Sequence, residues 1–432
     1  MALQQSLGSS APRAIVVGAG LAGLRAARCL VDGGLEVEVH EASDGVGGRV
    51  RTDELDGFQL DRGFQVILTG YPRLSAALDL EALELRRFEP GALVRRDGRM
   101  HRMVDPFRRP SRALQAAFGG LGSLSDKLRV GKLRQACLAG DDDAAFTRAD
   151  RTTDEALHAR GFGPELLDGF FRPFLGGILL DRGLGTSSRF FEFVFRMLAR
   201  GDTAVPSAGM GELSRALARS LPAGAVRLDS PVATVAPDGR GVTLANGEQR
   251  EADLVVTAVE GPAVAALHPT LGAAATAEPG SRSVTCLYFD APRSPVGEPT
   301  LVLGGDDQGL VNNLAVLSDV APTYAPPGRH LVSVTVLGTQ ADADGLERSV
   351  RAELGGWFGP EVDDWRSLRT YRIDHAQPAQ PPGTHEPLER DPRLGERSFV
   401  CGDHRVHASL EGAVRSGEVA ARAALAALGV HA

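Results

Sequence analysis

The spacing of three glycines near the start of the chain, Gly18, Gly20 and Gly23, indicates a phosphate-binding turn. They follow a short apolar run, residues 15–17, and precede a segment rich in Ala, Leu and Arg that is typical of a helix. In such a turn the first glycine permits the tight bend, the second lets a phosphate approach the backbone, and the third allows close packing of helix on strand. Free amides at the start of that helix, together with its dipole, would hold anionic phosphates.

A carboxylate follows at the end of the next predicted strand. Glu41 comes directly after residues 37–40, which resume the character of a buried strand. In a strand–helix–strand unit that binds a dinucleotide, an acidic residue here accepts hydrogen bonds from ribose hydroxyls and repels a 2′-phosphate. Strand, glycines, helix and Glu41 in register therefore predict a dinucleotide site that disfavours NADP.

Further motifs at both ends of the chain indicate that the dinucleotide is FAD and not NAD. Residues 45–52 read Gly-Val-Gly-Gly-Arg-Val-Arg-Thr and residues 61–63 read Asp-Arg-Gly, while residues 398–403 form a short strand that ends in Gly-Asp. These motifs resemble those of the FAD-dependent amine oxidase and phytoene desaturase superfamily of flavin-containing oxidoreductases. The resemblance covers most of the chain and is specific in its FAD-binding portions.

The resemblance implies which residues contact the cofactor. Arg49 and the glycines before it would lie against the phosphates and the ribityl chain, and Val232 would contact the adenine through its backbone. Asp403 would bond a ribityl hydroxyl or a pyrophosphate-linked water, and the helix beginning near Leu410 would stabilise negative charge on the reduced flavin. The predicted cofactor-binding set is Gly18, Gly20, Gly23, Glu41, Gly47, Gly48, Arg49, Val232, Gly402, Asp403 and Leu410.

Two departures from the amine oxidase pattern bear on catalysis. Many amine oxidases of this family place a Lys near flavin N5, but this chain has only Lys127 and Lys132, both in a basic helical region. Some members bind the flavin covalently through a Cys in the segment that resembles residues 371–383, which contains no Cys here. We therefore expect noncovalent FAD, and a desaturase-like dehydrogenase fits better than a monoamine-oxidase-like catalyst that uses oxygen efficiently.

A flavin dehydrogenase needs no hydrolytic triad, because FAD accepts the hydride and the protein aligns the substrate and tunes the ring. The candidates for polar contact near the ring are His375, Tyr371, Arg62, Gln65 and His407. The first three form our predicted catalytic set. We favour His375 because its segment should cross the substrate side of the flavin.

Composition narrows the class of protein. A formal net charge of −8 gives no support to a nucleic-acid role, and an apolar fraction of 43% suits a soluble globular enzyme. The four cysteines are scattered without metal-ligand spacing, so we expect no metal site, and they are consistent with a reducing cytoplasm. The first residues lack the apolar core of a signal peptide, and no apolar run approaches the length of a membrane span.

The expected fold is α/β, with a Rossmann-like FAD-binding domain on a parallel sheet interleaved with an α+β substrate domain of antiparallel sheet and helices. The domain boundaries expected from the motifs are residues 1–12 for a mobile N-terminus, 13–60, 205–262 and 395–432 for the FAD-binding domain, and 61–204 and 263–394 for the substrate domain.

Two segments of the substrate domain stand out. Residues 161–200 hold eight of the 17 Phe; most should pack in the core, and one face of the segment at 190–195 is open to an apolar ligand or lipid. Residues 111–140 are mostly helical and basic, which is typical of a solvated helix and leaves open contact with an acidic partner or a membrane surface.

These features predict an FAD-dependent oxidoreductase that removes a hydride from a largely apolar small molecule, by C–C desaturation or C–N oxidation. The electron acceptor is oxygen or another compound, and the oligomeric state stays open. The alternatives are an amine oxidase that uses oxygen, a flavin isomerase without net oxidation, and a noncatalytic binding protein for lipidated partners.

Overall fold

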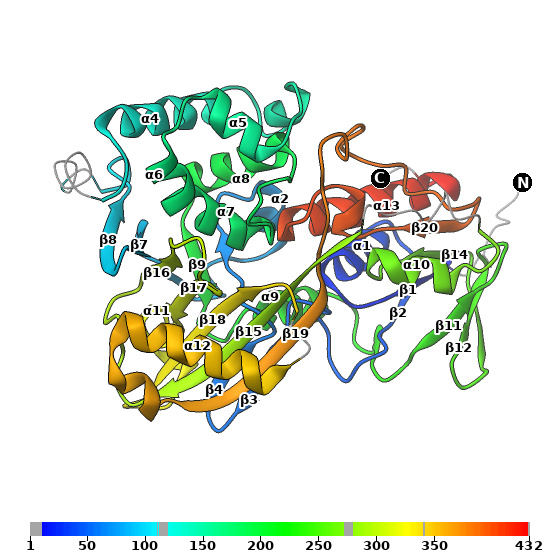
Figure 1. Cartoon of the computed structure of the whole chain (residues 1–432). Coiled ribbons are helices and arrows are strands. Elements are labelled where there is room, and N and C mark those ends of the chain that lie inside the picture. Colours follow the sequence, from blue (N-terminus) through cyan, green and yellow to red (C-terminus); the bar gives the residue numbers. More distant parts are fainter. Residues whose placement is uncertain (1–10, 110, 112–119, 272–279, 340–341, 431–432) are drawn as a thin grey trace, which may run out of the picture. The chain divides into compact units, whose positions relative to one another are not determined.

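The computed structural model describes residues 11–109, 111, 120–271, 280–339 and 342–430. The chain forms two compact units, each assembled from separate stretches of sequence (Figure 1). Unit 1 comprises Met1–Gly48, Ser214–Glu278 and Glu389–Ala432, and unit 2 comprises Arg49–Leu213 and Pro279–Leu388. Helix α9 (Gly211–Arg219) spans one of these boundaries.

Unit 1 is built on a five-stranded parallel sheet with the order β10-β2-β1-β14-β20. Its strands are β1 (Arg13–Val17), β2 (Glu36–His40), β10 (Val226–Arg227), β14 (Leu254–Thr257) and β20 (Ser398–Val400). β1 and β14 are nearly continuous apolar runs, as expected of parallel strands that are covered on both faces. The predicted parallel sheet of a Rossmann-like domain is confirmed.

Three helices and a smaller sheet cover the parallel sheet of unit 1 (Figure 1). Helices α1 (Leu21–Asp32) and α13 (Leu410–Ala427) pack side by side, so closely that a Cβ on Gly417 would overlap the carbonyl oxygen of Ala22. Ile15, Val17 and Val255 pack instead against the small antiparallel sheet. That side is formed by β11 (Val232–Val235), β12 (Gly241–Leu244), β13 (Gln249–Glu251) and α10 (Gly261–Leu267).

Unit 2 is organised around a seven-stranded sheet with the order β19-β15-β18-β17-β16-β7-β8. The strands are β7 (Gly91–Arg96), β8 (Arg99–Val104), β15 (Ser281–Ala291), β16 (Leu301–Gly304), β17 (Val311–Val316), β18 (His330–Leu337) and β19 (Arg366–Pro378). Helix α12 (Ala343–Phe358) covers one face through a core that includes Val334, Val350 and Leu354. The sequence predicts an antiparallel sheet for the substrate domain. All neighbouring strands in this sheet are antiparallel except β16 and β7, which are parallel, so the sheet is mixed.

The rest of unit 2 consists of short strands and helices. The strands are the hairpin β3 (Thr52–Leu55) and β4 (Phe58–Asp61), and the small sheet of β5 (Ile67–Leu68), β9 (Thr203–Pro206) and β6 (Leu85–Arg87). The helices are α2 (Pro72–Ala77), α4 (Leu124–Leu138), α5 (Thr153–Ala159), α6 (Pro164–Leu166), α7 (Arg172–Leu179), α8 (Ser188–Arg200) and α11 (Leu317–Val320). The predicted basic helix at 111–140 corresponds to α4, and residues 112–119 lie outside the described residues.

The phenylalanines of α8 differ from the expectation that they leave one face for a ligand. Phe190, Phe191 and Phe193 are buried, and Phe195 is half-buried. The ring of Phe193 stacks on Tyr71 with 6.2 Å between ring centroids. These aromatic side chains therefore pack α8 against neighbouring parts of unit 2, and they do not form the open face for a ligand or lipid that the sequence suggested.

Candidate functional site

The predicted phosphate-binding turn lies between β1 and α1 of unit 1. Gly18 has a φ of +104°, a conformation that favours glycine, and its amide donates to the carbonyl oxygen of His40 at 2.8 Å. A Cβ on Gly18 would lie 2.6 Å from the carbonyl oxygen of Ala258, and a Cβ on Gly23 would overlap the carbonyl oxygen of Gly18. Both glycines are therefore required by the packing of strand, turn and helix.

Gly20 is a glycine for a different reason, because its surroundings leave room for a side chain. A Cβ built on Gly20 would have no described atom within 4 Å. Gly20 is also the N-cap of α1 and, lacking a side chain, supplies no capping oxygen to the first amides of the helix. Open space beside the start of a helix suits an anionic phosphate.

The second glycine cluster lies directly against the first. The amide of Gly47 donates to the carbonyl oxygen of Ala19 at 2.8 Å, and Gly47 forms a β-bridge with Gly20. Gly48 has a φ of +55°, and a Cβ on it would lie 3.7 Å from the Cα of Gly20. The structure thus brings together the two glycine motifs that the sequence singled out.

Both carboxylate oxygens of Glu41 are engaged by protein donors. Oε2 accepts from the amide of Ala19 at 2.8 Å, and Oε1 accepts from the amide and the hydroxyl of Ser43 at 3.0 and 2.7 Å. Oε1 thus accepts two bonds, whereas Oε2 has a second lone pair, so a ribose hydroxyl can still bond at Oε2. Glu41 therefore also fixes the glycine turn, a role that its position in the sequence did not reveal.

The segment that leads to Val232 runs beside Glu41. The amide of Ser230 donates to the carbonyl oxygen of Glu41 at 2.8 Å, and the amide of Asp229 donates to that of Ser43 at 3.0 Å. Val232 follows two residues later as the half-buried first residue of β11. The residue expected to contact adenine is thus close along the chain to the residue expected to bind ribose.

The C-terminal motif reaches the same edge of the parallel sheet. The amide of Cys401 donates to the carbonyl oxygen of Thr257 at 2.9 Å, so β20 ends level with β14. Gly402 has a φ of +152°, and a Cβ on it would overlap the ring of His404, which explains the glycine. Asp403 follows and is buried.

Helix α13 begins seven residues after Asp403 with an ordinary N-cap. The hydroxyl of Ser409 accepts from the amide of Gly412 at 3.0 Å and lies 3.0 Å from Nδ1 of the buried His407. Leu410 is the first helical residue and is half-buried. His407, a predicted polar candidate, therefore contacts the cap of α13.

Taken within unit 1, these residues fit a flavin dinucleotide. The open space at Gly20 matches the need of a pyrophosphate for close approach, and the carboxylate of Glu41 lies at the end of β2, where a ribose is expected.

Arg49 is the first residue of unit 2, and its guanidinium donates to the carbonyl oxygen of Ala376 at 2.9 Å.

In unit 2, two of the three catalytic candidates converge on one carboxylate. Asp53 accepts from the hydroxyl of Tyr371 at 2.7 Å and from the guanidinium of Arg62 at 3.0 Å. Burial by itself would raise the pKa of Asp53, but hydrogen bonds from Arg62 and Tyr371 bring that pKa below its ordinary value. Burial, and then the bond to Asp53, raise the pKa of Tyr371, so its hydroxyl stays protonated.

His375 lies apart from this cluster. It is an exposed residue of β19, in the stretch where the pairing of β19 with β15 is irregular. Gln65, another polar candidate, donates through its side chain to the carbonyl oxygens of Arg49 at 2.8 Å and Arg62 at 3.2 Å. Gln65 therefore ties together two residues that the sequence singled out.

A buried carboxylate also anchors the predicted Asp-Arg-Gly turn. Asp61 is 1% exposed, and its carboxylate accepts from the hydroxyls of Thr52 and Tyr324 and from the amide of Met210, at 2.5, 2.9 and 2.9 Å. Its carbonyl oxygen accepts from the hydroxyl of Tyr288 at 2.9 Å. The sequence marked Asp61 by its motif but gave no sign of the two tyrosines.

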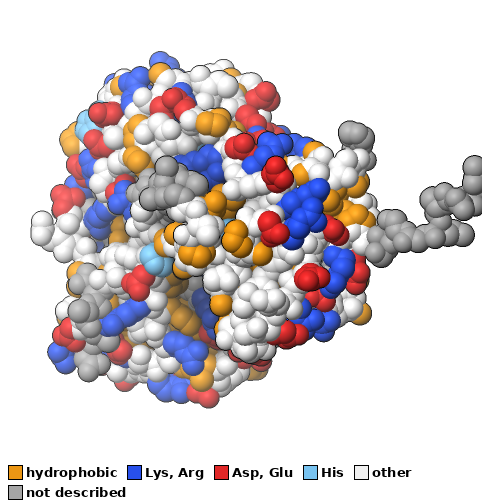
Figure 2. Space-filling view, turned by 90° about the vertical axis from the view of Figure 1, so that its right-hand side faces the viewer, with side chains coloured by type: hydrophobic (Ala, Val, Ile, Leu, Met, Phe, Trp, Pro, Cys, Tyr) orange, Lys and Arg blue, Asp and Glu red, His pale blue; other side chains and the backbone are white. Residues whose placement is uncertain are grey.

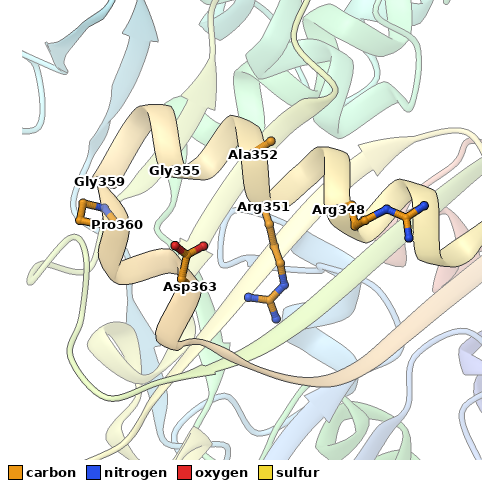
Figure 3. A pocket seen from close by; sticks show the side chains of 7 residues that line it. All are labelled: Arg348, Arg351, Ala352, Gly355, Gly359, Pro360 and Asp363. Carbon is orange, nitrogen blue, oxygen red and sulfur yellow. The ribbon is translucent and has the colours of Figure 1, made fainter.

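A pocket elsewhere in unit 2, along α12, has no place in this arrangement (Figure 3). Its lining residues are Arg348, Arg351, Ala352, Gly355, Gly359, Pro360 and Asp363. Arg351 donates to Glu347 and to the carbonyl oxygens of Val362 and Trp365, so it braces the end of the helix.

The described part of the chain offers neither a metal site nor a membrane-spanning helix. No group of His, Cys, Asp and Glu there could hold a metal ion. No helix there is both long enough and apolar enough to cross a bilayer.

Comparison with known proteins decides the family. A family model described as flavin containing amine oxidoreductase matches residues 21–425, nearly the whole chain. The chain belongs to this family. Membership of the flavin containing amine oxidoreductases implies FAD as cofactor and a small-molecule substrate.

Individual relatives match only parts of this amine oxidoreductase. Protoporphyrinogen oxidase 2 of Arabidopsis thaliana is 28% identical over 168 residues, 39% of this chain and 32% of its own length. Putrescine oxidase of Kocuria rosea is 43% identical over 95 residues, 21% of this chain and 20% of its own length. These matches therefore span a third or less of the relatives' own length.

The fold agrees over a greater length. The crystal structure of an oxidoreductase from Methanosarcina mazei matches with a TM-score of 0.73 at 19% identity, covering 94% of this chain and 98% of that one. At this level of identity, the likeness supports the fold alone.

Proposed function

We propose that this protein is an oxidoreductase with noncovalently bound FAD that removes a hydride from a largely apolar small molecule, by C–C desaturation or C–N oxidation. The observation that carries the proposal is the open glycine cradle at Gly20, in a chain of a flavin-containing family. Bound FAD supplies a hydride acceptor at N5. The electrons then pass to oxygen or to another acceptor.

Unit 1 carries every residue of the predicted cofactor-binding set except Arg49, and these residues would hold the cofactor. Gly18, Gly20 and Gly23 shape the turn for the pyrophosphate, and Glu41 accepts from a ribose hydroxyl. Gly47, Gly48 and Arg49 continue along the phosphates and ribityl chain, and Val232 contacts the adenine. Gly402, Asp403 and the start of α13 at Leu410 complete the set near the flavin ring.

Noncovalent attachment is supported by the state of the cysteines. Cys401 is the cysteine closest in sequence to a predicted flavin contact, and burial raises the pKa of its thiol to about 12. A buried, neutral thiol is a poor nucleophile. Residues 371–383, where the resemblance places a covalent attachment, contain no Cys.

A dehydrogenase without a catalytic lysine is supported by the positions of the only two lysines. Lys127 and Lys132 both lie on α4, whose buried residues include Leu133 and Cys137. We propose that neither lysine contacts the flavin and that other groups align the substrate. We propose that His375 contacts the substrate, and that Asp53 holds Tyr371 and Arg62 in place for the same purpose.

The test is anaerobic mixing of the purified yellow protein with a panel of amines and polyenes, followed by admission of air. Bleaching of flavin absorbance by a polyene, with slow recovery in air, is the expected result. His375→Gln should slow bleaching about tenfold or more while leaving flavin content unchanged, and Tyr371→Phe should slow it less, because Arg62 still holds Asp53.

One alternative has a specific observation in its favour. The local match to putrescine oxidase points to an amine oxidase that uses oxygen. Bleaching by an amine with rapid recovery in air would establish that alternative. A yellow protein that no compound bleaches would favour an isomerase, and a colourless protein would favour a noncatalytic binding role and contradict the FAD assignment.

A further inference from the structure

Exposed apolar side chains gather in one stretch of unit 2. Six large hydrophobic side chains are exposed among the described residues, and four of them fall between residues 100 and 128: Met100, Phe107, Leu124 and Leu128. The two leucines are the most exposed of all six, at 59% and 64%. The other two, Leu228 and Leu310, are isolated in sequence from this stretch and from each other.

Helix α4 presents these leucines on its outer side. Its buried residues, Asp126, Leu133 and Cys137, share one side of the helix. Leu124 and Leu128 are one turn apart and lie opposite that side at 3.6 residues per turn. The outer side of α4 therefore also carries large apolar side chains, and these are exposed and do not belong to the packed side of the helix.

Phe107 extends the apolar surface beyond the helix. A Cβ on Gly131 would lie 3.5 Å from the ring of Phe107, and the guanidinium carbon of Arg134 lies 4.7 Å from its centroid. Gly131 falls on the same outer side of α4 as the two leucines. We call Phe107, Leu124, Leu128, Lys127 and Lys132 the α4 patch.

Basic residues surround this apolar surface. Residues 99–134 hold nine Lys and Arg against two Asp, a local charge of +7 in a chain whose net charge is −8. Three of these arginines pair with acidic residues from other segments: Arg102 with Glu298, Arg108 with Asp202 and Arg109 with Glu89. Both lysines of the whole chain lie on α4, on either flank of the leucines. On the face drawn in Figure 2, by contrast, basic and acidic side chains are intermixed.

We propose that the α4 patch docks on an anionic lipid membrane. Two leucines and a phenylalanine flanked by lysines match an interfacial helix, whose apolar side chains enter the bilayer while basic ones meet the headgroups. A solely acidic partner would use the basic residues and leave Leu124 and Leu128 in water. This proposal is about membrane binding alone. Docking would also bring the protein to apolar substrates dissolved in the membrane, and that consequence rests on the proposed function.

The test is co-sedimentation of the full-length, FAD-loaded protein with vesicles of phosphatidylcholine, with or without phosphatidylglycerol. We expect binding to the anionic vesicles that weakens with salt. Leu124→Ser with Leu128→Ser should weaken it about tenfold or more, and Lys127→Gln with Lys132→Gln should remove most of the dependence on phosphatidylglycerol. The matched controls, Leu228→Ser with Leu310→Ser and Arg240→Gln with Arg348→Gln, should bind as the unmodified protein does.

Three outcomes would overturn the proposal. These are no binding to anionic vesicles, equal loss in the control variants, and binding that depends on the lysines but not on the leucines, which would mean attraction by charge alone and would favour an acidic macromolecule over a membrane as the partner. All substituted leucines are exposed, so the folded state should persist, and the thermal midpoint and flavin absorbance of each variant establish this. Because flavin content and bleaching are measured separately, failure of docking is distinguishable from failure of the proposed function.

Discussion

Two glycines of the phosphate-binding turn should respond in opposite ways to substitution. Gly20→Val places a side chain in open space, so the free protein should keep its stability within about 1 kcal/mol, while its affinity for FAD should fall about tenfold or more. Gly23→Ala forces a Cβ onto the carbonyl oxygen of Gly18 and should lower the free energy of unfolding by about 1–3 kcal/mol. Denaturant unfolding of the FAD-free protein and FAD titration measure the two effects.

The Gly23→Ala variant serves as the control for Gly20→Val. If Gly20→Val destabilised the FAD-free protein as much as Gly23→Ala does, the space beside Gly20 would be needed by the fold rather than by a ligand. Unchanged affinity of Gly20→Val for FAD would contradict the location of the pyrophosphate.

A buried histidine should make stability depend on pH. His268 follows α10, is 5% exposed, and its Nε2 lies 2.8 Å from the hydroxyl of Thr257. Burial lowers the pKa of His268, so below the ordinary pKa of about 6.5 the unfolded chain binds a proton that the folded chain refuses. The free energy of unfolding should therefore fall as pH drops from 7 towards 5.

His268→Gln isolates this contribution. The variant keeps a polar side chain next to Thr257 but has no titratable group, so its stability should fall less over the same pH range than that of the unmodified protein. Identical pH profiles for the two proteins, measured by urea unfolding, would refute the argument.

At the residue scale, sequence predicts a site well where its residues are neighbours in the chain. Gly18, Gly20 and Gly23 carry their spacing within six positions, and the structure places them between β1 and α1. The partnership of Tyr371 with Asp53 spans 318 positions and depends on a fold that no local pattern encodes. For this reason the sequence did not identify Asp53 as a site residue, although Asp53 accepts hydrogen bonds from two catalytic candidates.

At the scale of elements, two helices should react oppositely to the same substitution. Gly417 of α13 faces the backbone of α1, so Gly417→Ala would separate the helices and should lower the free energy of unfolding by about 1–3 kcal/mol. Gly356 lies on α12 with open space around it, and Gly356→Ala should raise that free energy by about 0.5–1 kcal/mol through helix propensity. Denaturant midpoints compare the two, and equal signs would contradict this account of the α1–α13 contact.

Element types follow from local patterns better than element lengths do. Residues 232–235 and 242–244 are rich in Val and Thr and form β11 and β12, and the Asp56-Gly57 turn joins β3 to β4. Residues 74–85 have the pattern of a helix, but the helix there, α2, ends at Ala77 and is followed by a turn in which Asp79 accepts from backbone amides and then by β6. A side-chain acceptor thus competes with the helix, as is common for Asp.

At the scale of the whole molecule, the interleaving of two units follows from motifs at both ends of the sequence. Residues 398–403 resemble a flavin motif as residues 14–52 do, which predicts that the two segments share a unit; residues 398–403 and 14–48 lie in unit 1, whereas residues 49–52 belong to unit 2. Neither the neighbours of each strand nor the parallel pairing of β16 with β7 was available to sequence reasoning. The order of strands in a sheet depends on packing between segments that are distant in sequence, whereas the order of motifs can be read directly from the sequence.

The division into units makes a prediction about thiol reactivity. Cys137 and Cys286 belong to unit 2 and Cys401 to unit 1, and burial raises their pKa values to about 12, 11 and 12. At pH 8 all three should react with a thiol reagent only when their surroundings open. FAD at a hundred times its dissociation constant should slow labelling of Cys401 about a hundredfold, because it binds only closed unit 1. Labelling of Cys137 and Cys286, followed by peptide mass spectrometry, should change much less; equal slowing at all three thiols would mean that the two units open together.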